Sequence, residues 1–234
     1  METKLISFAS LKGGVGKSTH AVALTAGLLD QGHTVRFIET EEQGSAGAWA
    51  DEVAAIDGKL QSSYLSIEGS DFQQANDKLL ELSEGPEFVV VDTAGAANAG
   101  TLAALFTADL VVSPFTLTEW DMDGLKRTLT MFKRVFEQLN EDVPDSFLGL
   151  FVSEASFMSN VDRERLAALS DEMFIRKGMT KNANIKKWSE ACRTPGQLRE
   201  GIDRVEGSQP LNDASLTKVE KFINEYTKTI MEMF

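Results

Sequence analysis

The sequence has a single cysteine and no long apolar run, and both shortages exclude classes of protein. Cys192 has no second cysteine in the chain with which to form a disulfide, which is typical of a reducing cytoplasm. One thiolate per chain is also fewer than an iron–sulfur cluster normally requires, so we do not expect an electron-transfer protein. No apolar run approaches the roughly 20 residues of a transmembrane helix. The first residues show no signal-peptide pattern, and we expect a cytoplasmic protein.

Positive charge is scarce as well. The chain has 23 Lys and Arg residues against 36 Asp and Glu, a net charge of −13, which disfavours binding of nucleic acid through overall charge. The imbalance is uneven, because residues 173–234 contain 11 basic and 8 acidic side chains. A local basic patch in the last third therefore stays open. The length of 234 residues and the 42% hydrophobic content predict one globular domain, spanning residues 1–234.

The most informative stretch is a glycine-rich turn between an apolar run, Leu5–Ala9, and a helix-like segment, Ala21–Leu29. This order is typical of a phosphate-binding loop, in which glycines let successive backbone N–H groups point at phosphate oxygens. In such a loop Lys17 would reach the β- and γ-phosphates, and the Ser18 hydroxyl would ligate Mg²⁺. The predicted nucleotide-binding residues are Lys12, Gly13, Gly14, Val15, Gly16, Lys17, Ser18 and Thr19.

The loop departs from its common form in two ways. Leu11 stands where a glycine is usual, and a second lysine, Lys12, lies inside the loop. The chain thereby resembles the ParA/MinD family of P-loop ATPases with a deviant Walker A loop. The resemblance follows the element order along the whole chain, although its specific motifs lie in residues 1–125. Among family members, the compact length and the 114–125 segment resemble small ParA-like proteins of the VirC type. The family implies ATP and Mg²⁺ as cofactors.

Short β-rich runs alternate with longer amphipathic stretches along the chain. This alternation predicts a doubly wound, mostly parallel α/β sheet flanked by helices, the P-loop NTPase fold, with the ligand beyond the carboxyl ends of the strands. We expect strands at 4–9, 34–38, 64–67, 88–91, 110–112 and 147–152. We expect helices at 18–30, 47–56, 71–82, 122–139, 161–173, 184–192 and 216–233. Trp49, Trp120 and Trp188 are predicted to be core or interface anchors.

Acidic residues follow several of these strands. Asp92 ends an apolar run beside the predicted loop, where a carboxylate can hold a Mg²⁺-bound water. Gly95, three residues later, is similar to a switch glycine whose N–H senses the γ-phosphate. An ordinary strand-terminal turn is the alternative, since Asp-Thr-Ala-Gly is good turn chemistry.

Glu39 and Glu41 occupy positions where ParA-type ATPases usually have Asp-x-Asp. The resemblance implies that Glu41 orients the attacking water and that Glu39 lies near the Mg²⁺ shell, with Lys12, Lys17 and Asp92 completing the catalytic set. Both carboxylates are one methylene longer than usual, and a displacement of about 1 Å can cost on the order of 100-fold in rate. Slow turnover follows, and a nucleotide-binding scaffold with little turnover stays an alternative.

The family also implies a role for Lys12. There this lysine reaches the phosphates of a partner subunit, in a homodimer that encloses two ATP molecules, which makes dimerisation depend on ATP. Asp121 and Asp123 follow a later strand. We expect one of them to cap the helix after it, and a resting-state salt bridge between Asp121 or Asp123 and Lys12 is the alternative.

By resemblance, the ATP-bound dimer binds DNA non-specifically, positions cargo such as a plasmid, and is released when a ParB-like or other adaptor stimulates hydrolysis. Such a protein would associate with the nucleoid. A MinD-like membrane-surface ATPase is the alternative. The apolar stripe of the 216–233 helix is predicted to pack on the sheet, because its polar face has mixed charge where a membrane helix would be strongly basic. The candidate DNA contacts are Arg176, Lys177, Lys181, Lys186, Lys187, Arg193 and Arg199.

Overall fold

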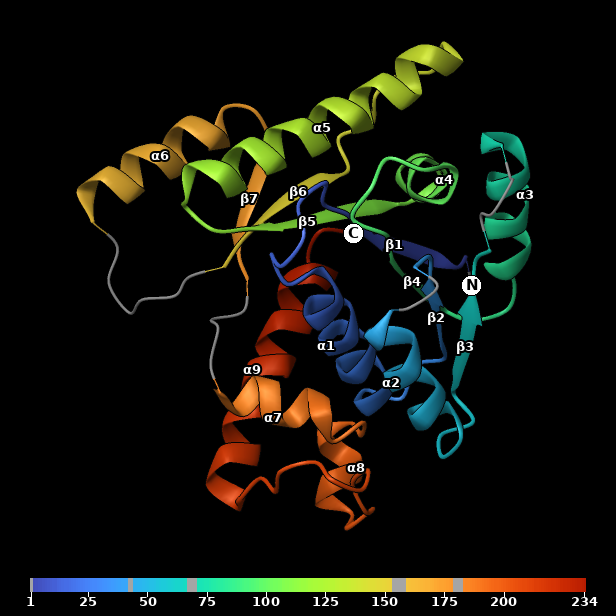
Figure 1. Cartoon of the computed structure of the whole chain (residues 1–234), viewed down its shortest axis with the longest axis vertical. Coiled ribbons are helices and arrows are strands. Elements are labelled where there is room, and N and C mark those ends of the chain that lie inside the picture. Colours follow the sequence, from blue (N-terminus) through green and yellow to red (C-terminus); the bar gives the residue numbers. More distant parts are fainter. Residues whose placement is uncertain (1, 42–43, 67–70, 153–158, 179–182) are drawn as a thin grey trace.

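The computed structural model describes residues 2–41, 44–66, 71–152, 159–178 and 183–234. In these parts seven strands form one parallel sheet, in the order β3-β2-β4-β1-β5-β6-β7, with helices on both faces (Figure 1). The strands are β1 (Lys4–Phe8), β2 (Val35–Glu39), β3 (Leu60–Tyr64), β4 (Phe88–Asp92), β5 (Leu110–Phe115), β6 (Phe147–Phe151) and β7 (Phe174–Lys177). The helices are α1 (Lys17–Asp30), α2 (Ser45–Ala54), α3 (Phe72–Leu82), α4 (Ala99–Thr107), α5 (Glu119–Leu139), α6 (Asn160–Ser170), α7 (Ala183–Glu190), α8 (Pro195–Arg199) and α9 (Asp213–Met231).

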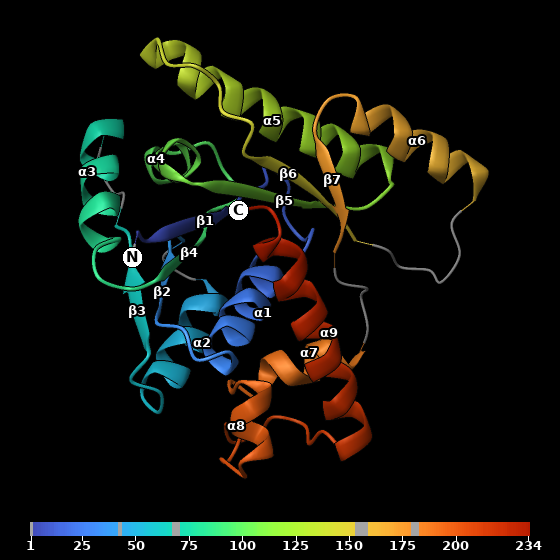
Figure 2. The same ribbon diagram turned by 180° about the vertical axis from the view of Figure 1, so that it is seen from behind.

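The sheet is buried on both faces, which confirms the predicted doubly wound fold. Helices α1, α2 and α9 cover one face and α3, α4 and α5 the other, as two opposite views show (Figures 1 and 2). In β4, Val90 enters the core under α1, whereas Val89 and Val91 enter the core under α4 and α5. Two apolar environments explain why this strand is apolar without alternation.

The strand order reverses around β1, which lies between β4 and β5. Phe8 at the end of β1 pairs with Asp92, and Asp92 pairs with Glu39 at the end of β2. The carboxyl ends of three strands therefore lie at one level. In doubly wound sheets the crevice at such a reversal is where ligands bind.

Several sequence-based boundaries were wrong. The strand expected at 64–67 is β3, which lies at Leu60–Tyr64 and pairs with β2 from Val35 to Glu39. Its sequence is polar because β3 is an edge strand with only Leu60 buried, so pairing and not hydrophobicity defines it. Ile67, in the expected strand, lies outside the described residues. Three short elements, α4, β7 and α8, were not predicted.

The C-terminal helix α9 buries its apolar stripe inside the protein. Val219, Ile223 and Ile230 are each at most 1% exposed and belong to the core that α1 shares. The helices cross closely at Gly27, where a Cβ atom would lie 2.0 Å from the Thr227 hydroxyl. The stripe is buried as predicted, but its main partner is α1 and not the sheet on which we expected it to pack. None of the helices in the described parts of the chain is both long and apolar enough to cross a bilayer.

Candidate nucleotide-binding site

The glycine-rich turn connects β1 to α1 at the carboxyl edge of the sheet, as the sequence predicts. Gly14 has φ of 79° and Gly16 has φ of 95°, a left-handed conformation that glycine adopts without strain. Gly13 and Gly14 face open space, since a Cβ built on either would meet no atom within 4 Å. His20 lies beneath the turn, with its Nδ1 2.7 Å from the Gly16 carbonyl oxygen. The turn thus leads into the N-terminus of a long helix, where orphan N–H groups and the helix dipole favour phosphate.

Lys17, Ser18 and Asp92 lie together beside this turn. The Lys17 Nζ is 3.8 Å from the Asp92 Oδ1, and both side chains are at most 10% exposed. Burial raises the pKa of Asp92 above its usual value, while Lys17 and a hydrogen bond from Ser18 oppose the rise. The Oδ1 atom is buried and accepts no hydrogen bond from any residue that the structure describes. An unpaired buried oxygen beside a hydroxyl group fits a hydrated Mg²⁺ ion that nucleotide phosphates also hold.

The protein alone does not supply a complete metal site. No group of three His, Cys, Asp or Glu side chains with metal-binding geometry occurs within the described residues. A hard cation at Asp92 would therefore take most of its ligands from phosphate and water, which is the usual arrangement for nucleotide-bound Mg²⁺.

Glu39 is almost fully buried, with 5% of its surface exposed. Its Oε1 accepts a hydrogen bond from the Glu41 N–H at 3.3 Å and its Oε2 one from the Gly47 N–H at 3.2 Å. Burial, together with the charge of nearby Asp92, raises the pKa of Glu39 to about 7. The Glu39 side chain therefore contacts backbone at the start of α2.

Glu41 and Gly95, the other predicted residues at the strand ends, are exposed. The Glu41 charge contributes to the raised pKa of Asp92. The segments after β2 and β4 are tied together, because the Ala94 N–H donates to the Thr40 Oγ1 at 2.7 Å. The structure thus brings Lys17, Ser18, Glu39, Glu41 and Asp92 to one edge of the sheet.

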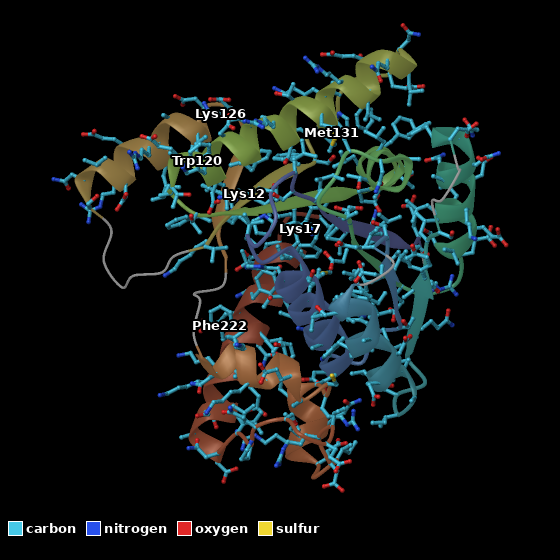
Figure 3. All side chains as sticks on the ribbon, in the orientation of Figure 1. Lys12, Lys17, Trp120, Lys126, Met131 and Phe222 are labelled. Carbon is cyan, nitrogen blue, oxygen red and sulfur yellow. The ribbon has the colours of Figure 1, made fainter. Side chains whose placement is uncertain are left out.

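Lys12 extends away from Lys17, toward α5. Its Nζ forms an ion pair with Asp121, which also accepts a hydrogen bond from the Thr116 hydroxyl. Figure 3 shows Lys12 beside the start of α5 and Lys17 on the α1 side. Burial alone would raise the pKa of Asp121, but hydrogen bonds from Lys12 and Thr116 lower it below its usual value.

The expected capping role of Asp121 or Asp123 is wrong. The helix starts three residues earlier than predicted, and Thr118 is its N-cap, accepting a hydrogen bond from the Asp121 N–H. The alternative salt bridge to Lys12 is the one observed, through Asp121. Asp123 instead forms an exposed ion pair with Arg127.

Two further residues of α5 hold the loop and were not predicted from the sequence. Thr128 accepts a hydrogen bond from the Leu11 N–H at 3.1 Å. Gly124 leaves room for Lys12, whose Cβ would be 3.1 Å from a Cβ at that position. Together with Asp121 they follow a spacing of three and four residues, which places them on one face of the helix. That spacing was visible in the sequence, but nothing there showed that the face meets the loop.

The candidate DNA-binding residues differ in exposure and in whether they already have an acidic partner. Lys186 has an 81% exposed side chain with an ion-pair distance of 4.0 Å to Glu190, and Lys187 lies on the same helix, α7. Arg193 is 11% exposed and lies near Glu52, while Arg199 forms ion pairs with Glu220 and Asp213. Arg176 and Lys177 are in β7, and Lys181 lies outside the described residues.

The parallel sheet and the glycine-rich turn, with its buried lysine and carboxylate, define a P-loop nucleotide-binding protein. Comparison with known families is more specific. The family model "VirC1 protein" matches residues 3–171, so the chain belongs to this family. The chain is also similar to a chromosome partitioning protein ParA of Myxococcus xanthus, 23% identical over 207 residues, which are 73% of each chain.

Another relative is protein IncC of Escherichia coli, 28% identical over 188 residues, which are 64% of this chain and 50% of IncC. The chain spans about half the length of several curated relatives it matches. Two solved structures share the fold. A putative plasmid partition protein of Borrelia burgdorferi bound to AMPPNP gives a TM-score of 0.64 at 19% identity, covering 98% of this chain and 100% of that one. A complex of Cyanothece McdA with ATP gives 0.67 at 18% identity, covering 94% and 96%.

Proposed function

We propose that this protein is a Mg²⁺-dependent ATPase that forms a homodimer around ATP, binds DNA as the dimer and thereby positions cargo. The observation that carries the proposal is the presence of two lysines in one loop with separate partners. Lys17 is buried beside Asp92, whereas Lys12 is 38% exposed and extends to α5. One lysine serves the nucleotide of its own subunit, and the other is available to a second subunit once it leaves Asp121.

Within one subunit, backbone N–H groups of 13–16 and the Lys17 ammonium bind and orient the phosphates. Bound Mg²⁺ neutralises phosphate charge, and the Ser18 hydroxyl and Asp92 would hold it, Asp92 through water. The exposed Glu41 carboxylate, as part of this edge, accepts a hydrogen bond from the attacking water and orients it. A Cβ atom built on Gly95 would meet no atom of the described residues within 4 Å. The space beside Gly95 is therefore open, and its N–H can approach a γ-phosphate.

The dimer is tested by measuring molecular mass in solution with ADP and with ATP. We expect a monomer with ADP and a dimer with ATP. Lys12→Ala should bind ATP but stay monomeric. Asp121→Asn should lower the ATP concentration for half-maximal dimerisation by about threefold to tenfold, because the ion pair between the partly exposed Lys12 and the buried Asp121, worth about 1 kcal/mol, no longer restrains Lys12. A wild-type protein that binds ATP and remains monomeric, or a Lys12→Ala variant that dimerises and turns over normally, contradicts the role of Lys12.

DNA binding in this proposal is a property of the dimer. Lys186 and Lys187 supply weak phosphate contacts from each subunit, and pairing two subunits doubles them. Arg193 and Arg199 contribute less, because each already has an acidic partner. We expect ATP-dependent binding to DNA of any sequence that weakens steeply with salt. Lys186→Glu with Lys187→Glu should abolish it without affecting dimerisation, and unchanged binding would contradict this surface.

The burial of the α9 stripe disfavours the membrane-surface alternative, which predicts ATP-dependent sedimentation with anionic vesicles. A cytoplasmic, nucleoid-associated location follows from the DNA-binding proposal. Release from DNA would follow slow hydrolysis that a ParB-like or other adaptor stimulates. The scaffold alternative predicts dimerisation with no measurable turnover.

A further inference from the structure

The side chain of Glu39 spans a gap between two pieces of backbone. One oxygen, Oε1, is 3.3 Å from the Glu41 nitrogen, and the other, Oε2, is 3.2 Å from the Gly47 nitrogen. We infer that Glu39 is a positioning residue, which fixes the backbone that carries Glu41 to the first turn of α2. This differs from the place near the Mg²⁺ shell that the family resemblance implies.

The first turn of α2 needs such an acceptor. Its N-cap is Gly44, which has no side chain and makes no side-chain capping hydrogen bond. Gly47 is the third residue of the helix, and its N–H is one of the orphan donors that an Asp or Ser at the N-cap would normally satisfy. Glu39 supplies that acceptor from the end of β2.

The glycines around Glu39 leave room for it. A Cβ atom at Gly44 would lie 2.2 Å from Glu39 Oε2, and a Cβ at Gly47 would lie 3.3 Å from the Glu39 Cβ. Gly44 has φ of −71° and ψ of 131°, which any residue can adopt. Steric access for the carboxylate therefore accounts for glycine at this position, because the backbone conformation does not require it.

The length of the side chain decides what it reaches. An aspartate here would withdraw the carboxylate by one carbon–carbon bond of about 1.5 Å, which exceeds the margin of a hydrogen bond. This chain has glutamate where Asp-x-Asp is usual. The additional methylene lets the carboxylate reach the uncapped start of α2, and the two glycines leave the space that it occupies. Its consequence for turnover, through the placement of Glu41, rests on the proposed function.

Two substitutions separate positioning from a role near the metal. Glu39→Asp keeps the charge and loses the reach to both N–H groups, whereas Glu39→Gln loses the charge but keeps the reach and one of the two acceptor oxygens. If Glu39 positions the backbone, the Gln variant should retain more ATP turnover than the Asp variant, by about tenfold, the effect of one lost hydrogen bond. If it serves the metal, the Asp variant should be the better enzyme, and the Gln variant should need more Mg²⁺. An Asp variant equal to or better than the Gln variant overturns the inference.

A second measurement does not depend on turnover. In the protein without nucleotide, exchange of both the Glu41 and the Gly47 amide hydrogens should be about tenfold faster in Glu39→Asp than in wild type. Glu39→Gln has a single amide oxygen that can accept from one N–H, so one of the two amides should stay within about threefold of the wild-type rate. Equal exchange in wild type and Glu39→Asp overturns the inference. Absence of ATP hydrolysis in the wild type would instead refute the proposed function while leaving this measurement decisive.

Gly44→Ala tests the same contact from the side of the helix. Its added methyl group would displace the Glu39 carboxylate, so Gly47 exchange should rise about as much as in Glu39→Ala. Combining the two substitutions should add nothing further, because they remove the same hydrogen bond. Additive effects would show that Gly44 acts independently of Glu39 and would contradict the inference.

Discussion

Lys12 and Lys17 illustrate how environment separates two identical side chains of one loop. Lys17 has a 10% exposed side chain beside a buried carboxylate at the end of β4. Lys12 extends over Gly124 to a carboxylate on α5. Removing Lys17 would leave Asp92 as an unpaired buried charge, whereas removing Lys12 would leave Asp121 its hydrogen bond from the Thr116 hydroxyl. Loss of Lys17 should therefore lower both stability and nucleotide binding. Loss of Lys12 should chiefly weaken the proposed ATP-dependent dimer.

Two buried titratable residues near the loop should have opposite effects on stability as pH changes. Burial lowers the pKa of His20 to about 4, so the unfolded chain binds its proton first and the folded protein loses stability below about pH 6.5. Burial raises the pKa of Glu39 to about 7, so the folded protein holds the proton longer and gains stability as pH falls from about 7 toward 4.5.

Urea unfolding at about pH 7 and about pH 5.5 checks these signs. Each group should change the free energy of unfolding by roughly 1–2 kcal/mol over this range, in opposite directions. Relative to wild type, His20→Gln should therefore gain stability on acidification and Glu39→Gln should lose it. Parallel pH profiles for all three proteins would show that neither group titrates as proposed.

At the scale of elements, α5 and α9 support the phosphate-binding turn from two sides, α5 through the loop before α1 and α9 through α1 itself. The face of α5 that contains Asp121, Gly124 and Thr128 contacts the loop before α1. On the other side of the sheet α9 packs along α1, which begins at Lys17. The position of the phosphate-binding turn thus depends on helices that are remote from it in sequence.

The crossing of α1 and α9 should be intolerant of added volume. Gly27→Ala would place a methyl group 2.0 Å from Thr227 Oγ1 and 3.0 Å from Ile223 Cγ2. We expect a loss of about 1–3 kcal/mol in the free energy of unfolding. Gly58→Ala is the control, because a Cβ there meets nothing within 4 Å.

A second substitution tests the cause. The Thr227 hydroxyl is buried and has no hydrogen-bond partner among the described residues, so Thr227→Ala should relieve the clash and restore part of the stability of Gly27→Ala. Equal stability of Gly27→Ala and Gly58→Ala would mean that the helices separate at little cost.

For the whole molecule, tryptophan fluorescence reports on the proposed dimer. Trp49 and Trp188 are at most 3% exposed and meet edge to face, with ring centroids 6.4 Å apart. Trp120 is 78% exposed and precedes Asp121, the partner of Lys12 (Figure 3). If dimerisation brings a second subunit to Lys12, Trp120 lies at the contact, where aromatic anchors are enriched.

We therefore expect ATP to shift the emission to shorter wavelength and to lower quenching by acrylamide by about twofold, as exposed aromatic area is buried. ADP should do neither, and Trp120→Phe should remove the ATP response while leaving emission from the buried pair. An ATP response that persists in Trp120→Phe would show that the response comes from the buried pair, Trp49 and Trp188. A dimer without any change at Trp120 would place the interface elsewhere.

Much of the fold was predictable because local pattern and burial agree. The apolar run at 88–91, the glycine-rich turn and the amphipathic stripe of the last helix each have one reasonable structure. Prediction failed at β3, whose polar residues pair at the sheet edge, and at α8, which has only five residues. At β3, long-range pairing outweighs local preference. Helix α8 does have a local start signal, the capping box of Thr194 and Gln197 with Pro195 at its first position, but its single short turn gives no apolar periodicity to detect.

The sequence by itself determined the phosphate-binding turn, the parallel sheet and the acidic strand ends, because these depend on residue type and short spacings. Tertiary structure alone decided the partners of three side chains. Lys12 meets Asp121, 109 residues away. Thr128 binds the Leu11 N–H across 117 residues. Glu39 turns to the start of α2 because glycines at 44 and 47 leave space for its carboxylate. Such contacts join segments that only the folded chain brings within hydrogen-bond distance, and no local pattern specifies them.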